Sequence, residues 1–216
     1  TDQNWSQVIM RMDSFIDEYV VSGGSKSSSE GEDERKHGEM RHKMGYLGQH
    51  RLFDQIRPLK RDIMTPDYCA LGDDDDDDDD DDVKINAWFG PKDTVSPLHY
   101  DPEHNLLAQV VGSKRIRLFP PTDSQYLYPT PSNMLQNTSL VDPESPDLNR
   151  YPLYAKASPF VCTLRAGEML YIPPGWWHHV RSLTASFSVS FWFGGEKAPQ
   201  LLKYNNVQSN RENKLA

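Results

Sequence analysis

Short apolar runs separated by polar turn residues dominate the second half of the chain. From residue 83 onward, segments rich in β-branched and aromatic residues alternate with Gly, Pro, Asn and Ser. Segments of this length and composition favour β-strands, and their number predicts an all-β sandwich or barrel. The expected strands are VKINAWF, NLLAQVV, KRIRLF, FVCTL, EMLYI and ASFSVSFWF.

The start of the chain has a different periodicity. Apolar residues recur there every three or four positions, which is the spacing of one helix face. We therefore expect an amphipathic helix over residues 4–20, followed later by a mixed segment with one short helix. The apolar positions are Trp5, Val8, Ile9, Met12, Phe15, Ile16, Tyr19 and Val20.

Three segments have no apolar period, and we expect them to lie outside the folded core. One is rich in Gly and Ser, one is ten consecutive aspartates, and one is the polar C-terminal tail. Like charges in a run repel one another and cannot pack. The expected division is an N-terminal helix (1–21), a flexible loop (22–43), a helical or irregular lead-in (44–72), a disordered aspartate run (73–82), a β-barrel core (83–195) and a disordered tail (196–216).

The net charge of −9 is local, because the ten aspartates contribute −10 and leave about +1 for the rest. Basic residues are scattered, so no nucleic-acid footprint is expected. There is no run of about 18 apolar residues and no secretory pattern at the start, so no membrane span or export signal is expected. Two cysteines without a CxxC motif favour free thiols in a reducing compartment. Because the chain begins with Thr1, we expect a fragment.

Strand parity gives the first clue to a site. In KRIRLF, Ile116 and Leu118 share one face and Arg115 and Arg117 share the other, so the apolar face should point inward. Lys114 has the inward parity. Either its stem lies along apolar surface with the ammonium in water, or it meets an anion inside the barrel. The long, proline-rich stretch 120–159 is expected to be an irregular insertion, and such insertions are often functional.

The stretch HYDPEHN gives the second clue. His99 and Asp101 lie two positions apart after a proline. A lone H-x-D is a weak signal, because a His–Asp hydrogen bond at a turn also explains it. If the pair holds a metal, a third ligand must come from elsewhere, and His104 is one rival candidate.

The third clue is WWHHV, which follows the turn-forming PPG. Adjacent strand residues point to opposite faces. His179 shares a face with Arg181, which suggests the outside, and His178 shares a face with Val180, which suggests the inside. Two histidines and one carboxylate with open positions form the facial triad of non-haem Fe(II) oxygenases. HExxH and G-x-S-x-G motifs are absent from the sequence, which argues against a zincin protease and a serine hydrolase.

Several longer stretches resemble the JmjC (Jumonji-C) 2-oxoglutarate oxygenases. These are HYDPEHNLLAQVVGSKRIRLFPP, VCTLRAGEMLYIPPGWWHHVRSL and SFSVSFWF. GYLGQHRLFDQI, TPDYCALGD and INAWFGPKDTVSPLHYDP narrow the resemblance to the bifunctional peptidase and arginyl-hydroxylase subfamily, historically also described as a lysine demethylase. The stretches HYD…FPP and WWHH also resemble the asparaginyl hydroxylase that inhibits hypoxia-inducible factor, which is the second choice within this class. The resemblance covers residues 1–193 with interruptions, and implies a mainly β double-stranded β-helix of the cupin or jelly-roll type with flanking N-terminal helices.

The resemblance also implies roles for individual residues. Plain core packing is the alternative for the two tryptophans, and capping of backbone is the alternative for the Tyr and Ser. The implied iron ligands are His99, Asp101 and His178; the implied cosubstrate contacts are Lys114, Ser96, Tyr46, Asn105 and Trp192; and the implied substrate-pocket residue is Trp88.

The implied cofactors are Fe(II), 2-oxoglutarate as cosubstrate, and O₂. The implied reaction is hydroxylation of an arginine side chain in a protein or peptide, with succinate and CO₂ as coproducts. Alternatives are a metal-dependent peptidase on methylated histone tails, a histone lysine demethylase, and a non-catalytic cupin binding module. A basic partner such as a histone tail, a role in chromatin regulation, and a nuclear or cytoplasmic location follow from the resemblance alone; nucleic acid and membrane are not expected as partners.

Overall fold

The structure, a computed structural model, describes residues 7–21, 44–72, 83–131 and 136–194. The Gly/Ser-rich loop, the aspartate run and the C-terminal tail, which the sequence predicts to be disordered, lie outside the described residues. Their place in the expected division of the chain therefore stays a prediction. Within the described ranges, no helix is long and apolar enough to cross a membrane.

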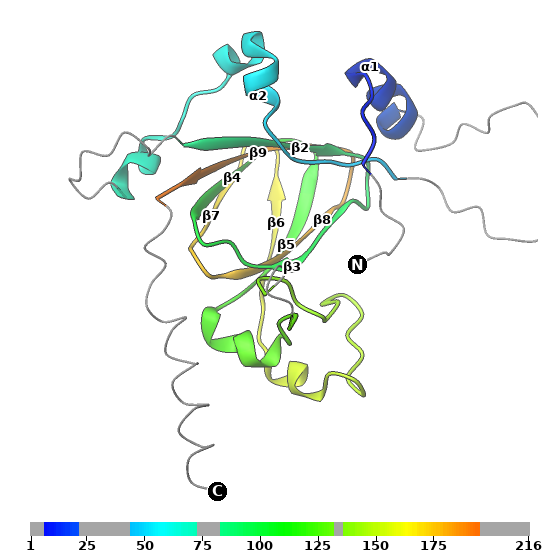
Figure 1. The fold of residues 1–216 in the computed structure, drawn as a ribbon, viewed down its shortest axis with the longest axis vertical. Helices are drawn as coiled ribbons and strands as arrows, with labels where there is room; N and C mark the ends of the chain where they lie inside the picture. Colours follow the sequence, from blue (N-terminus) through cyan, green and yellow to red (C-terminus); the bar gives the residue numbers. More distant parts are fainter. Residues whose placement is uncertain (1–6, 22–43, 73–82, 132–135, 195–216) are drawn as a thin grey trace, which may run out of the picture.

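Two antiparallel sheets face each other and form a barrel (Figure 1). From β2 onward, most consecutive strands lie in opposite sheets, which is the winding of a double-stranded β-helix. The predicted mainly β fold is thus confirmed. The first sheet has the order β1 (Leu47–His50), β2 (Lys84–Gly90), β9 (Ser186–Phe193), β4 (His104–Val111) and β7 (Met169–Ile172). The second has the order β3 (Val95–His99), β8 (Trp177–Ser182), β5 (Ser113–Phe119) and β6 (Phe160–Arg165).

Every strand expected from the pattern is present, but two strands were missed. β3 contains Pro97, which weakens a strand pattern; the chain tolerates it because β3 lies at a sheet edge. β1 lies in the segment expected to be helical or irregular, and it becomes a strand by pairing with β2. Both are held by tertiary partners that local sequence does not reveal.

Alternation along the strands separates two apolar clusters. The inner cluster fills the barrel and includes Leu107, Ile116, Leu118 and Val180, which agrees with the predicted inward face of KRIRLF. The outer cluster, around Leu106, covers the other face of the first sheet. There it packs against α2 (Leu52–Gln55) and the 3₁₀ helices η2 (Arg57–Asp62) and η3 (Asp67–Gly72), and Figure 1 shows α2 above β2 and β9.

The N-terminal helix is shorter than predicted. It begins with α1 (Met12–Phe15) and continues as a π-helix, η1 (Ile16–Val21), whereas residues 7–11 are not helical. Val8 and Ile9 are 71% and 103% exposed, so no apolar surface rewards a longer helix. Phe15 packs on Phe89.

Gly45 accommodates the ring of Tyr19 from this helix. A Cβ at position 45 would lie only 2.5 Å from that ring, so the ring of Tyr19 would have to shift. The close contact joins the N-terminal helix to the segment that leads into Tyr46 and β1.

The insertion at 120–159 packs on the outward face of the second sheet. It contains two 3₁₀ helices, η4 (Pro121–Tyr126) and η5 (Pro152–Lys156). Its Glu144 pairs with Arg117 at 2.7 Å and with Arg181. His179 was expected on the outer face of the barrel. It lies on that face, whereas His178 points inward, but its side chain is only 2% exposed. The insertion covers this face. Burial lowers the pKa of His179, and the nearby carboxylates of Glu144 and Asp142 in the insertion oppose this shift.

We predict that Glu144→Ala lowers the free energy of unfolding by about 1–3 kcal/mol, because it leaves the partly buried Arg117 without its carboxylate and Arg181 with only that of Asp93, at 3.5 Å. Urea unfolding of the full chain measures this. Asp13→Ala is the matched control: the side chains of Arg11 and Asp13 are 82% and 58% exposed, and we expect no measurable loss when this pair is removed. Equal losses in the two variants would contradict the proposed attachment of the insertion.

Candidate metal centre

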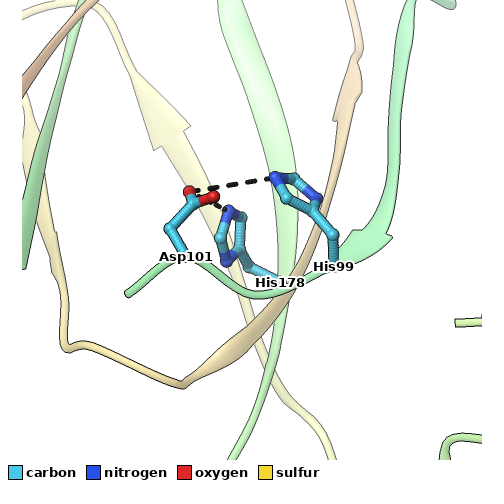
Figure 2. A group of neighbouring side chains, drawn as sticks. All are labelled: His99, Asp101 and His178. Atoms are coloured by element: carbon cyan, nitrogen blue, oxygen red, sulfur yellow. Dashed lines mark ion pairs between the residues drawn. The ribbon is translucent and has the colours of Figure 1, made fainter. Parts of the chain in front are cut away.

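Three side chains predicted to be metal ligands meet at one end of the barrel (Figure 2). His99 is the last residue of β3, and it lies opposite His178 of β8 in the strand register. Asp101 follows two residues after His99. Its Oδ2 lies 3.9 Å from Nε2 of His99 and 3.5 Å from Nε2 of His178, and one ligand atom from each residue lies within 4.8 Å of the others.

Backbone hydrogen bonds orient both imidazoles. Nδ1 of His99 lies 2.6 Å from the carbonyl oxygen of Pro97, and Nδ1 of His178 lies 3.0 Å from that of Trp176. A carbonyl only accepts, so each Nδ1 must carry the proton and donate. In the neutral rings, each Nε2 therefore has a free lone pair facing Asp101, which is the tautomer a metal requires.

The electrostatics of the site also suit a cation. Burial, together with the nearby charges of His99 and His179, lowers the pKa of His178 to about 3, so its ring is neutral at neutral pH. Burial raises the pKa of Asp101, His99 opposes this shift and Glu103 adds to it. Oδ2 of Asp101 is buried and has no hydrogen-bond partner among the residues that the structure describes. A divalent cation would satisfy that oxygen, and two imidazoles with one carboxylate fit Fe(II).

The ligands open into a cavity with about 370 Å³ of empty volume. The nine residues named from the sequence all line it, so the structure brings the whole predicted set together. Three apolar lining residues were not named as site residues, although strand parity pointed to the inward face of β8. The twelve lining residues are Tyr46, Trp88, Ser96, His99, Asp101, Asn105, Leu107, Lys114, Ile172, His178, Val180 and Trp192.

Lys114 lies at the inner end of this cavity and is 2% exposed. Burial lowers its pKa to about 8, and within the described ranges no carboxylate pairs with it. The ring of Tyr46 lies 5.8 Å from its Nζ. Burial raises the pKa of Tyr46 to about 12, while a hydrogen bond with Ser96 opposes the shift. An ammonium and two hydroxyls thus converge in a buried space that an organic carboxylate fits.

Asn105 and Trp192 are neighbours across β4 and β9. In the described part of the chain, neither Oδ1 of Asn105 nor Nε1 of Trp192 has a hydrogen-bond partner, although both atoms are buried. One acceptor and one donor are therefore unused there in the cavity wall. Trp88 differs, because its Nε1 donates to Oγ of Ser190 at 2.9 Å. Trp88 therefore presents a fixed aromatic ring, whereas Trp192 also offers a polar group.

His104, the rival ligand, does not join the cluster. Its Nδ1 lies 2.7 Å from the hydroxyl of Tyr171, and its ring stacks on Phe193. Adjacent strand residues point to opposite faces, and Asn105 points inward, so His104 faces the outer side of the first sheet.

We predict that His178→Ala and Asp101→Ala each weaken Mn(II) binding by more than about 100-fold, because each removes one of three ligands. Calorimetric titration of the full chain with Mn(II) measures this. His104→Ala is the control, and we expect it to bind Mn(II) like the unaltered chain. Normal binding by the Asp101 variant, or a loss in the His104 variant, would contradict the ligand set.

Comparison with known proteins supports a metal-binding cupin-type site. The family model for a cupin-like domain matches residues 1–198. Lysine-specific demethylase 8 from Xenopus tropicalis is 47% identical over 193 residues, covering 89% of this chain and 39% of the relative. Its namesake from Danio rerio is 49% identical over 193 residues, with 89% and 43% covered. The human bifunctional peptidase and (3S)-lysyl hydroxylase JMJD7 is 35% identical over 144 residues, with 57% and 45% covered.

The chain spans about two fifths of the length of these relatives. JmjC oxygenases use Fe(II) and 2-oxoglutarate, and the cavity offers a metal triad at one end and a buried ammonium at the other. Family model, relatives and site geometry agree: the chain belongs to the cupin-like domain family, among its JmjC members.

Proposed function

We propose that this chain is the catalytic region of an Fe(II)- and 2-oxoglutarate-dependent protein hydroxylase that oxidises an arginine side chain. The observation that carries the proposal is one cavity in which His99, Asp101 and His178 converge while Lys114 lies buried without a carboxylate partner. A non-catalytic binding module would not need both features together. When bound, Fe(II), 2-oxoglutarate and O₂ supply the oxidising chemistry, which yields the hydroxylated product, succinate and CO₂.

The chain's own residues bind and orient the reactants. Lys114 pairs with the distal carboxylate of the cosubstrate, and the hydroxyls of Tyr46 and Ser96 donate hydrogen bonds to it. Asn105 and Trp192 have unused polar atoms for the other end of that molecule. The apolar barrel interior excludes water around these contacts, which strengthens the charged ones.

An exposed aromatic residue near the metal ligands supports the proposal that the substrate is a peptide or protein. Leu118 lies between Phe160 and His178 in the strand register, and directly paired residues point to the same sheet face. The side chain of Phe160 therefore lies on the same face as the metal ligand His178. Yet Phe160 is 63% exposed and contacts the ring of Trp176. The exposed ring of Phe160, supported by the partly buried Trp176, suits the apolar part of a peptide next to the oxidised residue.

The choice of arginine follows from the resemblance to arginyl hydroxylases. The ring of Trp88 in the cavity wall is a suitable partner for a guanidinium, which stacks on aromatic faces. The carboxylate of Glu103, which raises the pKa of Asp101, adds negative charge beside the site. Both features also suit other cationic side chains.

Lysine demethylation is the second candidate, favoured by the names of the Xenopus tropicalis and Danio rerio relatives. The human relative's name adds a peptidase, for which the same metal would activate water. A basic peptide such as a histone tail is the proposed partner in each case, in the nucleus or cytoplasm. The free thiols of Cys69 and Cys162 are compatible with a reducing compartment.

We predict that Lys114→Met weakens 2-oxoglutarate binding by at least about 100-fold, since it removes a buried charged partner. In the unaltered chain, affinity should be constant below pH 8 and fall about tenfold per pH unit above it, because the lowered pKa leaves Lys114 neutral there. Calorimetry with the Mn(II)-loaded protein under nitrogen measures both effects.

The Lys114→Met variant should lack this pH dependence and should melt a few degrees higher, because a buried charge is replaced by an apolar side chain of similar length. Unchanged cosubstrate affinity in this variant would contradict the assignment of Lys114.

We predict a gain of one oxygen on arginine when the full chain is incubated with arginine peptides, Fe(II), 2-oxoglutarate and ascorbate in air. Mass spectrometry of matched arginine, lysine and methyl-lysine peptides measures it. The product should disappear without 2-oxoglutarate and in Asp101→Ala, and persist in His104→Ala. Demethylated lysine with formaldehyde, or shortened peptides formed without 2-oxoglutarate, would replace the arginine proposal by the demethylase or the peptidase.

A further inference from the structure

The insertion at 120–159 also contacts the segment that carries two metal ligands. β3 is an edge strand, and residues 136–139 run beside its end. His99 and Thr138 form an isolated antiparallel bridge, and the backbone N–H of Ser139 donates to the carbonyl of Leu98 at 2.8 Å. The insertion therefore covers the sheet edge at the point where His99 leaves it.

Asn137 holds the residue between the ligands from both sides. The backbone N–H of Tyr100 donates to the carbonyl of Asn137 at 2.9 Å. The side-chain Nδ2 of Asn137 donates to the carbonyl of Tyr100 at 3.0 Å. Tyr100 stands between His99 and Asp101, so both polar groups of its backbone are bound to one residue of the insertion.

Two further contacts hold the same segment, and both come from the chain around His178. The N–H of Gly175 donates to the carbonyl of Asp101 at 2.8 Å. The ring of Tyr100 packs edge-on against Trp177, with 4.8 Å between the ring centroids. The hydrogen bond to the Tyr100 carbonyl comes from the side chain of Asn137, so a substitution at position 137 removes it.

We propose that Asn137 is a positioning residue of the metal centre. Its amide holds the Tyr100 carbonyl, and this fixes the peptide group between Tyr100 and Asp101. Without that bond, the peptide between Tyr100 and Asp101 is free to rotate, and the carboxylate moves relative to the two imidazoles. Metal affinity depends on groups of this kind that orient the ligands.

The remaining contacts of this part of the insertion do not need the Asn137 side chain. Thr130 binds the carbonyl of Thr138 through both its N–H and its hydroxyl, at 2.8 Å each. The N–H of Leu140 donates to the carbonyl of Tyr128. Substitution at Asn137 should therefore leave residues 137–140 attached to residues 128–130.

Thr130→Val is accordingly a matched control. It removes one partly buried side-chain hydrogen bond from the same segment, on the side away from the ligands. Asn137→Asp is the test variant, because a carboxylate has the shape of the amide but cannot donate to the Tyr100 carbonyl. Asn137→Ala is the second variant, which serves if the aspartate variant does not fold.

The experiment is a titration of the full chain with Mn(II), and with Co(II) followed by its visible spectrum. We expect Asn137→Asp and Asn137→Ala to weaken Mn(II) binding about 10- to 100-fold and to alter the Co(II) spectrum. Thr130→Val should keep the Mn(II) affinity and the Co(II) spectrum of the unaltered chain. The melting temperature should shift by a similar amount in all three variants.

Unaltered affinity and spectrum in the Asn137 variants, or an equal loss in Thr130→Val, would overturn the proposal. It rests on the metal centre and not on the arginine reaction, so a chain that binds Mn(II) as expected but oxidises no arginine leaves it standing. Failure of the unaltered chain to bind Mn(II) would remove the centre and the proposal together.

Discussion

β3 and β8 pair in the register that sets His99 opposite His178, and the metal centre depends on this pairing. Side chains along a strand alternate, so a slip of one residue would turn the outward His179 toward the cavity and move His178 out of it. The pairing of β8 with β3 also carries Ser96 toward the cavity, and the pairing of β8 with β5 aligns Lys114. The ligands and the buried ammonium thus share one structural cause.

Burial of polar groups in an apolar barrel has a cost that the fold alone does not offset. Lys114, Asp101, Asn105 and Trp192 each retain an unsatisfied polar group or a shifted pKa in the cavity wall. Groups of this kind weaken a protein unless a ligand supplies their partners. Their concentration in one cavity indicates that the chain gives up stability at this place to bind a cation and an anion.

The second sheet is supported from outside by the insertion. Glu144 attaches it to Arg117 and Arg181, and His179 is buried between the sheet and this cover. Farther along, residues 136–139 add to the edge of β3. The segment predicted to be irregular therefore buries the outer face of the very strands whose inner faces carry the ligands, which connects its packing to the rigidity of the site.

The sequence by itself determined the inward and outward faces, because alternation is a local property of a strand. Lys114, Ile116, Leu118 and His178 could be assigned inward from their neighbours alone. The spacing of His99 and Asp101, together with the resemblance, named the polar and aromatic residues of the cavity but not its three apolar ones. Tertiary structure decided what has no local signal: that Leu47–His50 becomes a strand by pairing with β2, that the helix begins only at Met12, and that His179 is covered. It also decided that Asn137 meets Tyr100. These outcomes depend on contacts between residues far apart in the chain, and such contacts form only when the whole barrel closes.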